Sequence, residues 1–201
     1  VKVMDMVGID NMLRTAHKLG INSLDEDSDS YGPSLTLGGG EVSLIDLTYS
    51  YSVFANNGVM SGMPIKEESL RSGFRTLDPI VLLTIKDNEN NVLEICGTDL
   101  KSSCEFSNVD TKIVLSPELA YLVNHVLSDE RSRIPAFGYP NPLELGRPAA
   151  AKTGTTNNFV DSWTIGYTPQ LVVGVWMGNS DSSRMIDVSG SKGAAPIWHA
   201  V

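Results

Sequence analysis

The sequence of 201 residues has little cysteine and little histidine. Its two cysteines, Cys96 and Cys104, lie eight positions apart in a polar segment, and its three histidines (His17, His125 and His199) are scattered. A structural zinc site needs clustered cysteine and histidine ligands, which this chain lacks, so we expect no metal and no cofactor. The two cysteines are compatible with a local disulfide in an exported protein and with two free thiols otherwise.

Positive charge is also scarce. Fifteen Lys and Arg residues stand against 24 Asp and Glu, for a formal net charge of −9. Along the sequence the basic residues form no cluster that would neutralise phosphates, which argues against a nucleic-acid partner. The same balance argues against peripheral binding to anionic lipid.

Long apolar runs are missing too. None approaches the roughly 20 residues that span a bilayer, and Leu171–Met177 is among the longest. The pattern of a signal peptide is also missing. The sequence opens on Val1 and stops at Val201 within an expected helix. We therefore expect residues 1–201 to be a single domain that is a piece of a longer protein, whose other segments this sequence does not reveal.

Apolar residues recur at helical spacing in several segments, and Gly, Pro, Asn and Ser mark their ends. In the helix that begins after Ser43, we expect Ser43 and Asp46 to form a capping box. In the helix that begins after Ser116, we expect Pro117 at the first position and a buried face formed by Leu119, Leu122, Val123 and Val126. The first expected helices are a buried segment over Val1–Val7 and a helix from Asp10 to Leu19 with Asp10 as its N-cap. The next runs from Leu44 to Phe54, with an apolar stripe of Leu44, Leu47, Tyr51 and Phe54. The helix from Pro117 and a last one from Ala194 complete the set.

Strand signals are strongest near the C-terminus. Trp163, Ile165 and Tyr167 alternate along one expected strand, and Leu171–Met177 returns as the next after a turn at Thr168-Pro169-Gln170. Gly166 and Gly174 are expected to leave room for close packing on one face of this sheet. A hairpin is expected from Ile80–Lys86 and Asn91–Ile95, whereas residues 59–79 and 128–148 read as loops. Helices followed by consecutive antiparallel strands and a closing helix predict an α+β fold, with an antiparallel sheet flanked by helices in three αβα layers.

One stretch, Ala149–Thr156, carries chemistry. It places Lys152, Gly154 and three hydroxyls (Thr153, Thr155 and Thr156) on a short extended segment just before two apolar strands. Small residues, one cation and hydroxyls at the rim of a sheet suit the binding of a carboxylate and of a reacting carbonyl. The glycines of Gly38–Gly40 lack the Lys-Ser/Thr of a P-loop and are interpreted as a tight turn.

With its flanking segments, this stretch resembles the class A, bifunctional penicillin-binding proteins, over essentially the whole chain. The segments that carry the resemblance are Leu37–Leu47, Asn141–Ala151, Lys152–Gly154, Asp161–Pro169, Leu171–Gly178 and Gly193–Trp198. That family uses three motifs, Ser-x-x-Lys, Ser-x-Asn and Lys-Thr-Gly. Only Lys-Thr-Gly has its expected context here. Ser-x-Asn is absent, and the one Ser-x-x-Lys, Ser189–Lys192, follows Lys-Thr-Gly in a glycine-rich turn.

The resemblance implies an incomplete β-lactamase/transpeptidase-like fold whose first two motifs precede this segment in the parent. It implies that Lys152, Thr153, Gly154 and Thr155 belong to the catalytic site. The N–H of Thr155 would serve as one oxyanion donor, and the hydroxyls of Thr153 and Thr155, with Thr156, would bind the substrate carboxylate. Lys152 would add positive potential, and Gly154 would let substrate lie against the strand.

The implied activity is that of a serine-type D,D-transpeptidase, which cross-links D-Ala-D-Ala stem peptides of peptidoglycan through an acyl-serine and binds β-lactams. The implied parent is an extracytoplasmic protein, anchored in the cell membrane and carrying an upstream glycosyltransferase domain. The implied partner of this piece is the N-terminal half of the transpeptidase domain. A D,D-carboxypeptidase or serine β-lactamase of the same fold, and a non-catalytic muropeptide or β-lactam sensor, remain alternatives.

Overall fold

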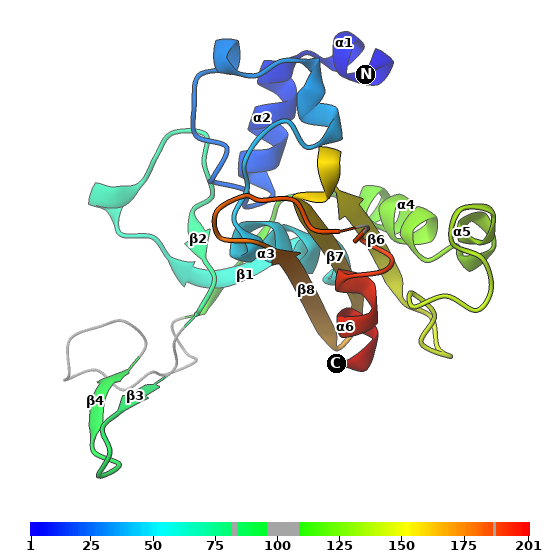
Figure 1. Ribbon diagram of the computed structural model, residues 1–201. Coiled ribbons are helices and arrows are strands. Elements are labelled where there is room, and N and C mark those ends of the chain that lie inside the picture. The colour runs from blue at the N-terminus through cyan, green and yellow to red at the C-terminus, as the bar shows by residue number, and fades with distance from the viewer. Residues whose placement is uncertain (82–83, 96–108, 187) are drawn as a thin grey trace.

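The computed structural model of the chain describes residues 1–81, 84–95, 109–186 and 188–201 (Figure 1). Cys96 and Cys104 lie outside these residues, so the disulfide question stays as the sequence left it. The helices are α1 (Lys2–Val7), α2 (Ile9–Lys18), α3 (Leu44–Ala55), α4 (Pro117–Leu127), α5 (Glu130–Phe137) and α6 (Ala194–Ala200). The strands are β1 (Val59–Pro64), β2 (Leu77–Asp78), β3 (Thr84–Lys86), β4 (Val92–Ile95), β5 (Asp110–Ile113), β6 (Ala150–Thr155), β7 (Asp161–Thr168) and β8 (Leu171–Gly178).

The main sheet is antiparallel, in the order β6-β7-β8, as the sequence predicts. Its register pairs Lys152 with Ile165 and Ile165 with Gly174 across the three strands. Helices α3 and α6 both pack on β7 and β8, and Figure 1 shows the sheet between them. The predicted α+β class, with an antiparallel sheet flanked by helices, is confirmed.

The two glycines of this sheet lie on opposite faces, contrary to the prediction of one face. Gly166 pairs with Val173, whereas Gly174 pairs with Ile165, so the two differ by one step of the strand alternation. A Cβ on Gly166 would lie 2.4 Å from Trp198 of α6, and one on Gly174 would lie 2.0 Å from Thr48 of α3. Each glycine therefore lets one helix approach the sheet closely, which creates the three layers.

Helix α3 begins as predicted, because the Ser43 hydroxyl accepts a hydrogen bond from the Asp46 N–H at 3.2 Å. The carboxylate of Asp46 does not complete the capping box. It accepts instead from the N–H of Ser23 and from the guanidinium of Arg75, and only 7% of the Asp46 side chain is exposed. The buried residues of α3 are not the predicted stripe but Asp46, Tyr49, Ser50 and Val53. The reason is that α3 lies between two sheets, and Tyr49 and Val53 pack toward the smaller one.

That smaller sheet has the order β2-β1-β5 and corrects the prediction of a loop over residues 59–79. Strand β1 carries no apolar alternation, and it exists because it pairs antiparallel with β5, so that Val59 faces Ile113. Pairing between segments so far apart in sequence leaves no local signal. The predicted hairpin is confirmed as β3-β4, with Lys86 opposite Val92, and Figure 1 shows it projecting from the body of the molecule.

Four further predictions need correction. The segment 128–148 contains helix α5, which begins with the Asp129 carboxylate accepting from the Ser132 N–H and holds Pro135 inside it. Helix α2 starts from Gly8 rather than from Asp10, which lies in its first turn. The apolar face predicted for α4 is largely exposed, because α4 turns Ala120 toward the protein instead (the exposed residues are Leu119, Leu122 and Val126). Helix α1 forms as predicted but is not buried, since only its Met4 is.

Candidate active site at the edge of strand β6

Strand β6, which carries the Lys-Thr-Gly motif, is the edge strand of the main sheet. At its end the N–H of Thr156 donates to the carbonyl of Asp161 at 3.1 Å, toward β7. Backbone groups of an antiparallel edge strand alternate between the partner strand and the open side. The N–H groups of Thr153 and Thr155 therefore point away from β7, to the side where this sheet has no further strand. The edge can hydrogen-bond an extended peptide or a developing oxyanion.

The start of β6 is held by a residue that sequence reasoning missed, Arg133 of α5. Its buried guanidinium donates to the carbonyls of Leu127, Leu143 and Ala149 at 2.6, 3.1 and 3.1 Å. These acceptors are the end of α4 and two points on the segment that leads into β6. Burial lowers the pKa of Arg133, although nearby carboxylates oppose this effect. An arginine in an expected loop carried no sequence signal for this role.

Lys152 is exposed, and its ammonium donates to the carbonyl of its neighbour Thr153 at 2.6 Å. It shares a face of the sheet with Ile165 and Gly174, which is the α3 face. The side chains of Thr153 and Thr155 lie on the other face. The structure therefore gathers these residues on one short strand but not on one side of it.

Thr155 is exposed and Thr153 is partly exposed. The Thr155 hydroxyl accepts a hydrogen bond from the Gly190 N–H at 2.8 Å, which leaves its own hydrogen free to donate. Among the residues that the structure describes, no hydrogen-bond partner is found for the Thr153 hydroxyl. Both hydroxyls can therefore donate to a carboxylate that approaches the strand edge.

The hydroxyl of Thr156 is already engaged. It accepts from the Asp161 N–H at 2.7 Å and donates to the Asp161 carboxylate at 3.1 Å. That carboxylate also accepts from the indole of Trp176 at 2.8 Å. In this arrangement Thr156 fixes the turn between β6 and β7, and Thr153 and Thr155 carry the donors that remain available.

The loop before α6 is fastened over the same strands by buried hydroxyls. Ser162 donates to the carbonyl of Ser189 at 3.1 Å, and Thr164 donates to that of Gly190 at 3.3 Å. The hydroxyl of Ser162 also accepts from the N–H of Ala194 at 3.0 Å. The only Ser-x-x-Lys of the chain thus lies in a turn ahead of a seven-residue helix, with the Ser189 hydroxyl 3.0 Å from that of Ser191. This is not the start of a core helix, where a nucleophile of that motif belongs.

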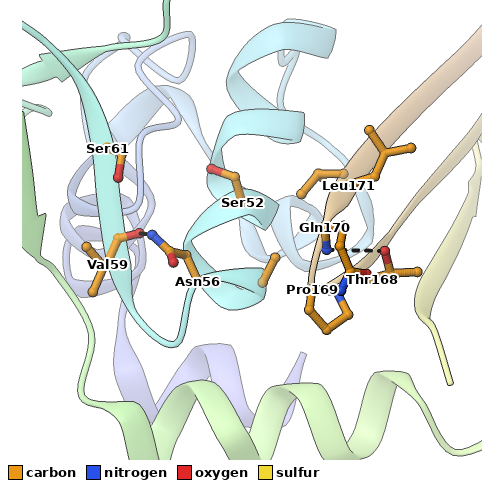
Figure 2. Close-up of a pocket in the computed structure, with 10 residues that line it drawn as sticks. Ser52, Asn56, Val59, Ser61, Thr168, Pro169, Gln170 and Leu171 are labelled. Carbon is orange, nitrogen blue, oxygen red and sulfur yellow. Dashed lines mark hydrogen bonds between the residues drawn. The ribbon is translucent and has the colours of Figure 1, made fainter. Parts of the chain in front are cut away.

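The cavity shown in Figure 2 lies elsewhere. It measures about 240 Å³ and lies between the end of α3 and the β7–β8 turn, at the end of β7 opposite Asp161. Its lining includes the hydroxyls of Ser52 and Ser61 but no ionisable side chain. The cavity therefore lacks a base that could activate either hydroxyl as a nucleophile. Along the described parts of the chain, no group of His, Cys, Asp and Glu is arranged to hold a metal ion, and no helix is long and apolar enough to cross a membrane.

No family model matches the chain, but individual relatives do. Penicillin-binding protein 1A of Aquifex aeolicus is 31% identical over 199 residues, which cover 98% of this chain and 23% of that protein. Penicillin-binding protein 1A of Rickettsia typhi is 29% identical over 211 residues, which cover 98% and 24%. The chain therefore spans about a quarter of the length of these curated relatives.

The crystal structure of penicillin-binding protein 1A from Haemophilus influenzae matches 98% of this chain and 31% of its own, with a TM-score of 0.58 at 20% identity. At that identity the match shows the fold, which is an incomplete α+β fold of the transpeptidase type. The resemblance that the motifs indicate is thereby confirmed: over nearly its whole length this chain is similar to one part of the class A penicillin-binding proteins.

Proposed function

We propose that this chain is the C-terminal part of a D,D-transpeptidase domain that acts in peptidoglycan synthesis and binds penicillin. One observation supports it best: Lys152–Thr155 forms an open edge strand with outward N–H groups and two hydroxyls that can donate. The relatives named penicillin-binding protein 1A support the same family of activities. The proposed substrate is the D-Ala-D-Ala stem peptide, and β-lactams compete for its place.

In this proposal, strand β6 is the wall of the active site. The terminal carboxylate of the stem peptide accepts hydrogen bonds from the hydroxyls of Thr153 and Thr155, with Lys152 supplying positive potential nearby. The N–H of Thr155 donates to the carbonyl oxygen of the penultimate D-Ala as that oxygen becomes negative. Gly154, whose Cβ would lie 3.3 Å from Trp163, leaves the strand bare for the peptide.

The covalent step uses a serine and a base that we assign to sequence outside residues 1–201. The serine oxygen loses its proton to the base and attacks the carbonyl carbon, and the tetrahedral intermediate expels D-Ala, which takes up the proton. The amine of a second stem peptide then attacks the ester carbonyl and gives up a proton, and the serine leaves with a proton as its hydroxyl is restored. The upstream glycosyltransferase domain, the membrane anchor and the extracytoplasmic location belong to the same proposal.

The first prediction concerns the nucleophile. The 201-residue chain, incubated with a fluorescent penicillin and run on a denaturing gel, is expected to carry no label. A version extended upstream to include Ser-x-x-Lys and Ser-x-Asn is expected to be labelled, since losing the nucleophile costs several orders of magnitude in rate. Heat-denatured extended protein is the control for nonspecific labelling. A stable adduct on the short chain would overturn the assignment of the nucleophile to sequence outside residues 1–201 and would implicate Ser189.

The second prediction concerns the carboxylate. In the extended protein, Thr155→Val is expected to slow acylation by about 10- to 100-fold, since a hydrogen bond to a charged group is worth about 1.5–3 kcal/mol. Thr155→Ser keeps the hydroxyl and is the matched control, expected to stay within about threefold of the wild type. The second-order rate of labelling by fluorescent penicillin measures both. Equal rates for Val and wild type would show that the carboxylate binds elsewhere.

The alternatives within the fold separate by product. A D,D-carboxypeptidase or a β-lactamase passes the acyl group to water, so free D-Ala or opened β-lactam accumulates without cross-linked dimers. A sensor binds β-lactam without turning over stem peptide. Mass spectrometry of a muropeptide digest after incubation with the extended protein distinguishes cross-linking from release of D-Ala, and mass spectrometry of added penicillin shows whether the β-lactam is opened.

A further inference from the structure

Another cavity collects positive charge from residues that are far apart in the sequence. It measures about 690 Å³ and lies between α2, the segment before β2, and the β1–β5 pair. Five of the fifteen basic residues of the chain line it, namely Arg14, Lys18, Arg71, Arg75 and Lys112. No Asp or Glu lines it, although acidic residues outnumber basic ones in the chain. The sequence-based interpretation that basic residues form no cluster therefore fails in three dimensions.

One of these five cations belongs to the framework. Arg75 is paired with the carboxylates of Asp46 and Asp78 at 2.5 and 2.7 Å, and it donates to the carbonyl of Gly20. Burial lowers the pKa of Arg75, but these carboxylates outweigh burial and leave it raised. Its charge is thus already compensated, and it holds α2, α3 and β2 together behind the cavity.

The charges of the other four cations are not compensated by a buried carboxylate in the part of the chain that the structure describes. Lys18 has no hydrogen bond or ion pair with any residue that the structure describes, and Lys112 donates only to the neutral hydroxyl of Thr76. Arg14 bonds the neutral side chain of Asn11, and it shares a face of α2 with Lys18, four residues on. Arg71 lies 3.8 Å from Asp25 in an exposed ion pair, which is weak enough for a ligand to replace.

The floor between these cations is apolar. Met60 and Val114 are buried beneath it, and the ring of Phe74 stacks on that of His17 at 3.9 Å between centroids. The guanidinium of Arg71 lies 3.7 Å from the centroid of the Phe74 ring, which holds it in place over that ring. The cavity therefore has oriented charges around an apolar base, the usual make-up of a binding site for an organic anion.

We propose that this cavity binds a phosphate-bearing ligand. Its cations come from three separate elements and so approach from several sides, which suits the tetrahedral oxygens of phosphate better than the planar pair of a carboxylate. The volume exceeds what a single phosphate fills, and the floor accepts an apolar portion. The ligand is a diphosphate or a phospholipid headgroup with part of its chain. This inference does not rest on the proposed transpeptidase activity.

The test measures binding to the 201-residue chain by isothermal titration calorimetry with inorganic pyrophosphate at low salt. It also measures cosedimentation with vesicles of phosphatidylglycerol, with phosphatidylcholine vesicles as the neutral reference. The variant Lys18→Gln/Lys112→Gln is expected to bind at least about tenfold more weakly, since two of the charges that line the cavity are lost. The matched control Lys86→Gln/Arg131→Gln removes two exposed cations outside the cavity and is expected to stay within about twofold. Lys18→Arg/Lys112→Arg keeps the charges and is expected to bind like the wild type.

Thermal unfolding of each variant checks that it is folded. If the Gln variant loses pyrophosphate binding and the control variant keeps it, the proposal is supported with a soluble diphosphate as ligand. If the Gln variant instead loses vesicle binding and the control variant keeps it, the proposal is supported with a lipid headgroup as ligand. The proposal is overturned if the wild type binds neither probe, or if the control variant loses as much binding as the cavity variant.

Discussion

At the scale of single residues, Tyr49 joins helix α3 to the smaller sheet. It lies on α3 with 6% of its surface exposed, and its single O–H is shared between the carbonyls of Ser61 at 2.9 Å and Leu77 at 3.3 Å. Burial raises the pKa of Tyr49 to about 12, although the nearby charge of Arg75 opposes this. Because this buried phenol must stay neutral in the folded chain, alkaline pH is expected to lower the stability of the fold.

Stability is therefore expected to fall as pH rises from about 10 to about 12. In this window Tyr49 keeps its proton in the folded chain, whereas an unfolded tyrosine, with a pKa near 10, loses it. Its contribution is fully present below pH 10 and is lost as pH rises through 12. Tyr49→Phe is expected to cost about 1 kcal/mol at pH 7 through the lost hydrogen bonds.

The variant is also expected to lose less stability than the wild type between those pH values. Some alkaline loss remains, because burial also raises the pKa values of Tyr51 and Tyr167. Urea unfolding at a series of pH values measures the difference. An identical pH dependence in the two proteins would contradict the assignment.

At the scale of elements, the three layers depend on how closely two helices approach one sheet. Helix α3 reaches Gly174 of β8 through Thr48, and α6 reaches Gly166 of β7 through Trp198. These contacts hold β7 and β8 between the two helices. Strand β7 in turn pairs with β6 and so supports the candidate active site. A side chain at either glycine would collide with a side chain of the facing helix, Thr48 or Trp198, which would have to shift.

Gly174→Ala is therefore expected to destabilise the fold by about 1–3 kcal/mol, the usual cost of overpacking. Its Cβ would lie 2.0 Å from the Thr48 hydroxyl, so Thr48→Ala in the same chain is expected to recover most of the loss. A double-mutant cycle of unfolding free energies measures the coupling. Gly32→Ala is the control, because a Cβ there has only Ser34 near it, at 3.7 Å. Additive effects at Gly174 and Thr48 would refute the close contact.

At the scale of the whole molecule, net charge and apolar surface oppose each other. The charge of −9 keeps copies of the chain apart at pH 7, and the sequence pI is about 4.7. Helix α4 nonetheless exposes a line of large apolar side chains, which include Leu119, Leu122 and Val126 at 52%, 58% and 71%. Exposed apolar surface of this kind favours association once repulsion is removed.

The chain is accordingly expected to be monomeric at pH 7 and to associate near pH 4.7, where its net charge vanishes. Leu122→Gln/Val126→Gln should reduce that association several-fold while leaving the fold intact, because both side chains are exposed. Light scattering across pH 4–8 measures it. Leu171→Gln, at another exposed apolar position, is the control. Equal association of the double variant and the wild type would show that the α4 face is not involved.

Much of the fold could be predicted because it depends on residues close together in sequence. The caps at Ser43 and Ser116, the alternation along β7 and the extended Lys-Thr-Gly strand all follow from side chains within a few positions of one another. Because such signals are local, the sequence also predicted that the candidate site residues share one strand, which is β6.

Other features depended on tertiary structure alone. The pairing of β1 with β5, the opposite faces on which α6 meets Gly166 and α3 meets Gly174, and the support of β6 by Arg133 join segments far apart in the chain. The convergence of Lys18, Arg71 and Lys112 around one cavity is of the same kind. The sequence by itself determined the local elements and the motif, since short-range geometry sets both. Packing decided which helix and sheet faces meet and which basic side chains line one cavity, since only the folded chain brings those residues together.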